Sequence, residues 1–259
     1  MGKNKLKKFR DMDTYKCVFQ YPFAALQSGG FPLKGVWGKE YFGNDNPIVV
    51  ELGCGKGEYA VQLARKMPQR NFIGIDIKGA RMWTGASQVE REGLKNVAFL
   101  RTSIELLASF FAAGEVSEFW ITFPDPQMKK VRRRLTSTRF LEIYRQVAVD
   151  RAVVNLKTDS PFLYTYTSRL VEANHLPILA NTDDLYHSDF ADDDILSIRT
   201  FYEQQWLDRG LSIKYLRFLL DHDTPLAEID DSDIPPDTYR SFSRGQLQCP
   251  ELLNNPDNN

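Results

Sequence analysis

The sequence has few cysteines and histidines, and this scarcity excludes several kinds of site. The three cysteines, Cys17, Cys54 and Cys249, lie far apart, and the whole chain has only 3 histidines. It contains no C-x-x-C pair and no Cys/His spacing typical of zinc, and an odd number of scattered cysteines does not indicate a disulfide framework. We therefore expect neither a metal site nor a disulfide-stapled fold.

Long apolar runs and a net excess of one charge are also missing. No apolar leader opens the chain and no run approaches the length of a membrane span, so we expect a cytoplasmic protein without membrane contact. Lys and Arg total 33 against 34 Asp and Glu, so any attraction to nucleic acid must come from local patches. Residues 3–10 hold five basic side chains and no acid, whereas 221–237 hold seven acids and no Lys or Arg.

The 259 residues are enough for one large α/β domain with appendages. We expect a basic, aromatic N-terminal arm over residues 1–45, an α/β domain over 46–220, and an acidic tail rich in Pro and Asn over 221–259. The aromatic residues of the arm indicate that it packs on the domain, with only about the first ten residues loose. The tail has the composition of an extended or mobile segment.

From position 48 onward, strand and helix patterns alternate, which predicts a mostly parallel sheet with helices on both faces. We expect seven strands, at residues 48–52, 71–75, 97–101, 118–123, 152–157, 178–180 and 213–220. Helices are expected at about residues 58–67, 80–92, 104–113, 138–149, 161–174 and 200–209. The predicted fold is thus a Rossmann-like α/β fold.

A glycine turn follows the first predicted strand and leads into a helix. Glu51 is followed by Gly53, Gly55 and Gly57, an E-x-G-x-G-x-G pattern. Glycines permit a tight turn and the close approach of a ligand, and the helix start offers free N–H groups. A dinucleotide site needs a glycine where Glu58 stands, so the pattern resembles the first motif of class I S-adenosylmethionine methyltransferases more than a NAD site. A structural strand-to-helix corner is the simpler alternative.

Ligands of open parallel sheets bind beyond the carboxyl ends of the strands. The polar residues at those ends are Glu51, Asp76, Ser103, Asp125 and Asp159. Asp76 lies 19 positions beyond Gly57, where an acid can hydrogen-bond the ribose hydroxyls of an adenosine. A capping carboxylate is the alternative for Asp76 alone, but together with the glycine turn we favour the ribose role.

The second informative stretch is Phe123-Pro124-Asp125-Pro126, which places one acid between two prolines just past the fourth predicted strand. The prolines favour extended conformations for Phe123 and Asp125 and make the acid rigid. Residues 129–139 then carry six basic side chains and no acid, which favours a phosphate-binding loop over a merely solvated one.

On these motifs, the sequence resembles the tRNA (guanine-N7-)-methyltransferase family over about residues 36–220. The stretches that carry the resemblance are Trp37–Gly57, Gly74-Ile75-Asp76, Phe123-Pro124-Asp125-Pro126 with Lys129-Lys130, Arg132–Leu135, Lys157-Thr158-Asp159 and Thr200-Phe201-Tyr202-Glu203. The P-D-P motif followed by basic residues is more specific for the family than the glycines are.

The resemblance implies S-adenosylmethionine as cofactor and tRNA as partner, with methyl transfer to N7 of the guanine at position 46 of the variable loop. Carried over, Glu51 and Asp76 hold the amine region and the ribose, the glycines and Ser103 complete the cofactor site, and Asp125 is the active-site carboxylate. The remaining implied contacts, to the target nucleotide or its surroundings, come from Lys129, Asp159, Thr200 and Glu203.

This sequence departs from the family pattern at three places. Ser103 and Gln127 stand where the family usually has Asp and Trp, and the basic loop is two residues shorter. Thr200 and Glu203 also match a capping box, in which both side chains bind backbone N–H groups. The alternatives that stay open are a class I methyltransferase with another substrate and a tRNA-binding module without catalysis. The chain could act as a monomer or a homodimer.

Overall fold

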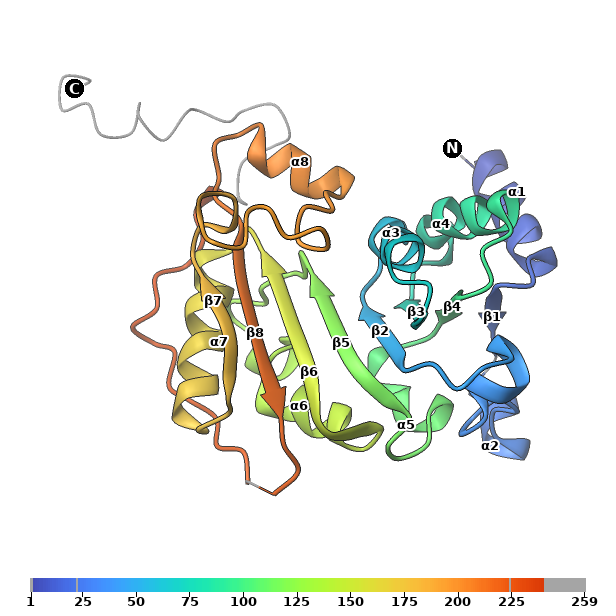
Figure 1. Cartoon of the computed structure of the whole chain (residues 1–259), viewed down its shortest axis with the longest axis horizontal. Coiled ribbons are helices and arrows are strands. Elements are labelled where there is room, and N and C mark those ends of the chain that lie inside the picture. Colours follow the sequence, from blue (N-terminus) through green and yellow to red (C-terminus); the bar gives the residue numbers. More distant parts are fainter. Residues whose placement is uncertain (1, 22, 224, 240–259) are drawn as a thin grey trace.

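The computed structural model describes residues 2–21, 23–223 and 225–239, which build one twisted sheet between helices (Figure 1). Within these residues the strands are β1 (Val18–Gln20), β2 (Ile48–Leu52), β3 (Asn71–Asp76), β4 (Val97–Arg101), β5 (Val116–Thr122), β6 (Ala148–Thr158), β7 (Ile178–Thr182) and β8 (Lys214–Leu220). Their order is β1-β4-β3-β2-β5-β6-β8-β7, and all neighbours are parallel except the two pairs that include β8. The predicted mostly parallel α/β sheet is confirmed.

The sheet has eight strands among the described residues, so the expectation of seven was one short. The additional strand, β1, lies in the N-terminal arm and pairs in parallel with β4, with Val18 opposite Phe99. Three residues show no readable alternation, and their extended conformation depends on hydrogen bonds to a strand some eighty positions away. Periodicity along the sequence therefore could not reveal it.

The helices follow the predicted alternation closely. They are α1 (Gly2–Thr14), α2 (Phe23–Gly29), α3 (Glu58–Lys66), α4 (Gly79–Glu92), α5 (Leu107–Phe110), α6 (Thr138–Arg145), α7 (Pro161–Ala173) and α8 (Phe201–Leu207). A π-helix, η1 (Trp37–Phe42), and three short 3-10 helices, η2 (Ile104–Leu106), η3 (Val131–Arg133) and η4 (Leu185–His187), lie between them. The helix expected over 104–113 is instead η2 followed by α5. The one expected over 138–149 ends at Arg145, because β6 already begins at Ala148.

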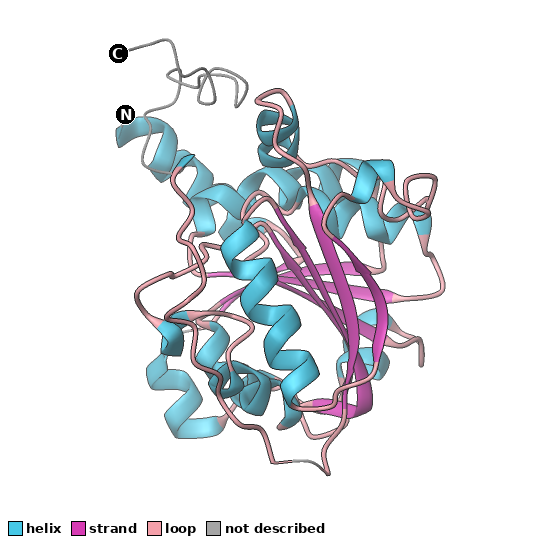
Figure 2. Cartoon of the chain, turned by 90° about the vertical axis from the view of Figure 1, so that its left-hand side faces the viewer, coloured by secondary structure: helices cyan, strands magenta, loops and turns pink. Residues whose placement is uncertain are grey.

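Helices cover both faces of the sheet (Figure 2). Tyr59 of α3 and Met82 of α4 are fully buried in the hydrophobic cluster of one face, which also contains Met12 of α1. On the other face, Tyr144 of α6 and Leu170 of α7 belong to the second cluster. The two apolar clusters fix the sheet between the helix layers and leave its carboxyl edge to carry polar groups.

The N-terminal arm is more ordered than expected. The first ten residues were expected to be loose, but described residues from Gly2 onward form α1, which packs on α4. Trp83 Nε1 donates to Asp11 Oδ2 at 2.9 Å, and Met12 is buried. Trp37 lies wholly inside the core and donates from Nε1 to the Phe110 carbonyl at 3.0 Å. The aromatic content of the arm is therefore core rather than surface.

The acidic C-terminal segment lies against the domain through residue 239. Asp231 pairs with Arg134 at 2.5 Å, Asp233 pairs with Arg169 at 2.8 Å, and Ile234 is buried. The segment is extended, as its composition predicts, and its acids neutralise basic side chains of the domain. The rest of the predicted tail, 240–259, lies outside the described residues. None of the helices in the described ranges is long and apolar enough to cross a membrane.

Candidate active site

A cleft opens at the carboxyl edge of the sheet, where β2, β3 and β5 end and α8 lies above them (Figure 1). Its volume is about 100 Å³. It is lined by Glu51, Gly53, Cys54, Gly55, Lys56, Glu58, Tyr59, Asp76, Arg81, Thr122, Phe123, Thr200 and Tyr202. Four of the six predicted cofactor residues line this cleft, because parallel strands bring their ends to one edge.

The glycine turn and the acid after β3 form one hydrogen-bonded unit. Gly53, Gly55 and Gly57 have φ values of +75°, +55° and +73°, which side chains rarely adopt. The N–H of Gly55 donates to Asp76 Oδ2 at 2.9 Å, and the N–H of Lys78 donates to Oδ1 at 2.7 Å. Asp76 is thus held at the cleft by the turn itself, and it is not the N-cap of α4, which is Lys78.

Gly57 also serves the packing of the helices behind the cleft. A Cβ at this position would lie 2.4 Å from the Phe99 ring. Gly85 of α4 approaches the same point, and its N–H donates to the Lys56 carbonyl at 2.8 Å. The third glycine of the motif is therefore required by the contact among α3, α4 and β4. By contrast, a Cβ at Gly55 would have no neighbour closer than 3.9 Å.

Glu51 is a buried carboxylate in the wall of the cleft, with 2% of its surface exposed. Its Oε1 accepts from Thr122 Oγ1 and its Oε2 from the Ala60 N–H, each at 2.9 Å. Burial raises the pKa of Glu51 to about 8, against the opposing effect of these two hydrogen bonds. A cationic group in the cleft would stabilise the ionised form.

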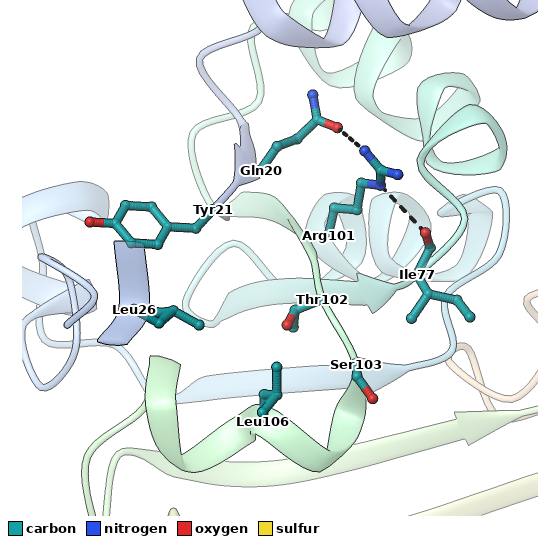
Figure 3. Close-up of a pocket in the computed structure, with 8 residues that line it drawn as sticks. All are labelled: Gln20, Tyr21, Leu26, Ile77, Arg101, Thr102, Ser103 and Leu106. Atoms are coloured by element: carbon teal, nitrogen blue, oxygen red, sulfur yellow. Dashed lines mark hydrogen bonds between the residues drawn. The ribbon is translucent and has the colours of Figure 1, made fainter. Parts of the chain in front are cut away.

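Ser103 does not line the cleft but a neighbouring cavity of about 340 Å³, shown in Figure 3. Consecutive residues line the two cavities, Asp76 the first and Ile77 the second. The Ser103 hydroxyl donates to Glu105 Oε2 at 2.6 Å. Gln20 and Tyr21 of the N-terminal arm form part of the wall of this side cavity.

The P-D-P loop leaves the sheet in an unusual backbone conformation. Phe123 lines the cleft with φ +49°, and Gln127 has φ +48°. The expectation that Phe123 is extended was therefore wrong: the turn at the end of β5 overrides the preference of a residue before proline. Such positive φ values cost energy and concentrate at functional sites. Asp125 is exposed, and its Oδ1 accepts from the Gln127 N–H at 3.1 Å.

The basic loop that follows has exposed and buried members. Lys129, Arg132 and Arg133 are exposed. Arg134 is wholly buried: it donates to the Gln127 and Met128 carbonyls at 3.2 and 2.7 Å. Together with the Asp231 ion pair, these bonds make Arg134 a structural anchor of the loop and not a phosphate ligand, contrary to the expectation for the whole cluster.

The other residues implied to contact the nucleotide or its surroundings differ in how far their side chains are exposed. Thr200 lines the cleft and caps α8. Glu203 completes the capping box, as the sequence pattern predicted, but its side chain is fully buried beside Lys157. Asp159 is 1% exposed, and its Oδ2 accepts from the Tyr239 hydroxyl at 2.6 Å. The structure thus brings Thr200 to the cleft and places the Glu203 and Asp159 carboxylates beneath the surface.

Sequence reasoning gave no role to several residues that line the cleft, among them Lys56, Arg81, Thr122 and Tyr202. Thr122 could have been found as the polar last residue of a buried strand. Tyr202 lies inside the Thr200–Glu203 motif, but only the fold shows that this motif crosses to the glycine turn. Over the described ranges, no group of three or more His, Cys, Asp or Glu side chains could hold a metal ion.

Comparison with known proteins agrees with this geometry. A family model described as "Putative methyltransferase" matches residues 45–216. A solved structure titled "Structure of an Antibiotic Related Methyltransferase" superposes with a TM-score of 0.54 at 14% identity, over 80% of this chain and 98% of that one. The fold, with its glycine turn and strand-end acids, is that of the class I S-adenosylmethionine-dependent methyltransferases.

Full-length relatives narrow this class. A protein of Bacteroides fragilis is 59% identical over 95% of this chain and 97% of its own length, and one of Porphyromonas gingivalis is 59% identical over 91% and 97%. Both are named tRNA (guanine-N(7)-)-methyltransferase. The chain belongs to this family of enzymes.

Substitutions at Gly55 and Gly57 should affect different properties, ligand affinity at Gly55 and folding stability at Gly57. Both Gly55→Ala and Gly57→Ala incur the cost of positive φ, about 1–2 kcal/mol. We expect Gly55→Ala to remain folded but to lose affinity for S-adenosylhomocysteine, because its Cβ stands in the open cleft. Gly57→Ala should lose considerably more stability, because its Cβ meets Phe99 at 2.4 Å. Urea unfolding and calorimetry measure the two effects; equal destabilisation, or wild-type affinity in Gly55→Ala, would contradict them.

Glu51 should make the stability of the free protein depend on pH. Its folded-state pKa of about 8 lies above the ordinary value of 4.5. The folded state therefore holds an extra proton between these values, and the free energy of unfolding falls as the pH rises through this window. One pKa unit corresponds to about 1.4 kcal/mol. Glu51→Gln should remove this part of the slope in urea unfolding between roughly pH 5 and 9; an unchanged slope would refute the shift.

Proposed function

We propose that this protein transfers a methyl group from S-adenosylmethionine to N7 of a guanine in tRNA. The observation that carries the proposal is the placement of a cleft lined by Glu51 and Asp76, a loop with one exposed carboxylate and a set of exposed cations at one edge of the sheet. Phe123 lines the cleft, Asp125 follows two residues later, and the basic loop comes next. Leu135, at the end of that loop, lies beside the Gly53 position.

The residues of the cleft fit the parts of the cofactor. The buried Glu51 carboxylate offers a counter-charge for the methionine ammonium group, and Asp76 is poised for the ribose. A Cβ at Gly55 would have no protein neighbour closer than 3.9 Å, so the space beside this residue is open to a ligand. A single cavity of about 100 Å³ is small for a ligand of this size, since such sites usually measure roughly 300–1,000 Å³. Both cavities together fall in that range, and we assign the adenine end to the one that Ser103 lines.

When bound, S-adenosylmethionine supplies an electrophilic methyl group on its sulfonium. Guanine N7 has a lone pair outside the aromatic system, so the protein needs no general base to activate it. The task of the chain is to orient the base, and this positioning lowers the barrier by removing rotational and translational freedom. Asp125 accepts hydrogen bonds from guanine N1–H and N2–H and favours the positive charge that develops on the ring.

The tRNA backbone is proposed to lie along the exposed basic residues of the loop. Lys129, Arg132 and Arg133 are exposed, whereas Arg134 holds the loop in place from inside. The molecule carries a net charge of −1, so attraction to the phosphates must be local. Asp231 and Asp233 of the C-terminal segment pair with Arg134 and Arg169 of the domain. These two acids therefore do not neutralise the exposed cations of the basic loop.

A third prediction concerns these exposed cations. Arg132→Gln together with Arg133→Gln should weaken tRNA binding and flatten the plot of log K against log salt by about 0.7–0.9 per lost phosphate contact. Lys39→Gln with Lys95→Gln is the matched control, because both lysines are exposed and lie outside the basic loop, Lys39 in η1 and Lys95 just before β4. Fluorescence titration at several salt concentrations measures the slope. Equal slopes in the two double variants would mean that the loop does not touch the backbone.

Asp125 should act through charge and hydrogen-bond geometry. Asp125→Asn presents an amide where guanine needs an acceptor, so single-turnover methylation should fall on the order of 10²-fold or more. Affinity for S-adenosylhomocysteine should change far less, since Glu51 and Asp76 serve that ligand. A variant rate near that of the wild type would remove Asp125 from the mechanism. A wild-type rate that rises with a carboxylate-like pKa would indicate base catalysis instead.

A further inference from the structure

Lys157 is a buried cation in β6 to which the proposed reaction gives no role. Its side chain has no exposed surface. Nζ donates to the Leu196 and Ile198 carbonyls, each at 2.8 Å, and lies 2.8 Å from Glu203 Oε1. Burial lowers the pKa of Lys157, and the Glu203 carboxylate opposes this effect. The ammonium group thus joins the central sheet to the loop before α8 and to α8 itself.

The Glu203 carboxylate is fully engaged inside the protein. Oε1 accepts from the Tyr186 hydroxyl at 2.5 Å as well as facing Lys157, and Oε2 accepts from the Thr200 N–H at 3.3 Å. In return, the Glu203 N–H donates to Thr200 Oγ1 at 3.2 Å. With no exposed surface and these partners, the carboxylate serves the first turn of α8 and does not reach a nucleotide in this conformation.

The same turn is attached to the glycine turn on its outer side. The Phe201 N–H donates to Glu58 Oε2 at 3.1 Å, and Lys56 Nζ lies 3.6 Å from the centre of the Phe201 ring. These contacts are at the surface, where Phe201 is half exposed, so each contributes modestly. The buried attachment through Lys157 is therefore the stronger constraint on the position of α8.

The attachment matters because α8 forms one wall of the cleft. Thr200 and Tyr202 face the same space as Glu51 and Asp76. The helix has only seven residues, and helices this short are not stable on their own, so its position depends on tertiary contacts. A continuous set of contacts leads from β6, through Lys157 and Glu203, to the cleft.

We propose that Lys157 is a positioning residue, which through Glu203 holds the first turn of α8 at the cleft so that Thr200 and Tyr202 contact the bound cofactor or the target nucleotide. This inference rests on the proposed function, because it assumes that the cleft holds the reactants. It also gives Glu203 the role of an internal anchor in place of a nucleotide ligand.

The test compares Lys157→Met with the double variant Lys157→Met/Glu203→Met. The single variant leaves a buried, unpaired carboxylate and should lower Tm, whereas the double variant replaces the pair with apolar groups and should recover much of that loss. Arg145→Met is the control for stability alone: Arg145 pairs with Glu142 and Asp221 at the far end of α6, away from the cleft. All assays are run well below the lowest Tm.

Affinity for S-adenosylhomocysteine, single-turnover methylation of tRNA, and hydrogen exchange of residues 201–207 are measured for each variant. In both Lys157 variants we expect affinity to fall by at least about tenfold or the rate by about 10²-fold, with faster exchange in α8. Arg145→Met should change none of the three. A double variant that recovers Tm but still binds S-adenosylhomocysteine weakly or methylates tRNA slowly would show that Lys157 acts by positioning α8 and not only by stabilising the fold.

Two outcomes overturn the proposal. One is a double variant that recovers affinity, rate and exchange together with Tm, which would make Lys157 a mere counter-ion of Glu203. The other is a folded Lys157→Met protein that binds and methylates like the wild type. Failure of the wild type itself to methylate tRNA would instead refute the proposed function, so the two failures can be told apart.

Discussion

The sharp turn from β2 into α3 is the constraint on which the rest of the molecule depends. The chain leaves the sheet through three glycines with positive φ, and the turn closes on Asp76 through the Gly55 N–H. Behind it, Gly57 and Gly85 let α3 and α4 approach each other over the Phe99 ring. The same residues thus set the helix packing and leave space for a ligand. A side chain at either place would disturb one function or the other.

Buried charge is the second organising feature. Glu51 stands in the wall of the cleft with a raised pKa and no cationic side chain bonded to it, which suits a charged ligand. The Lys157–Glu203 and Arg134–Asp231 pairs are different, because their charges are balanced within the protein. Each pair fixes a segment beside the cleft: the first fixes α8, the second the basic loop. Buried pairs add little net stability, but breaking one is costly, so they define position.

This division explains why members of one motif can have different surroundings. Of the Thr200–Glu203 motif, which was expected to contact the target nucleotide or its surroundings, Thr200 lines the cleft. The acid of the motif instead points inward to Lys157. Likewise, the basic loop is real, but Arg134 belongs to the interior. Charged residues of one motif can face the interior or the surface, and the sequence motif alone does not show which.

The sequence alone determined the order of strands and helices from position 48, the glycine turn, the strand-end acids and the family. These features are local, since periodicity, turn chemistry and strand ends can be read within a short window. Only the tertiary structure decided that Val18–Gln20 is a strand, that α1 packs on α4, and which charges are buried. Those outcomes depend on partners far away in the chain. An edge strand needs a neighbour to bond with, and a charge is buried only where the fold supplies its counter-charge.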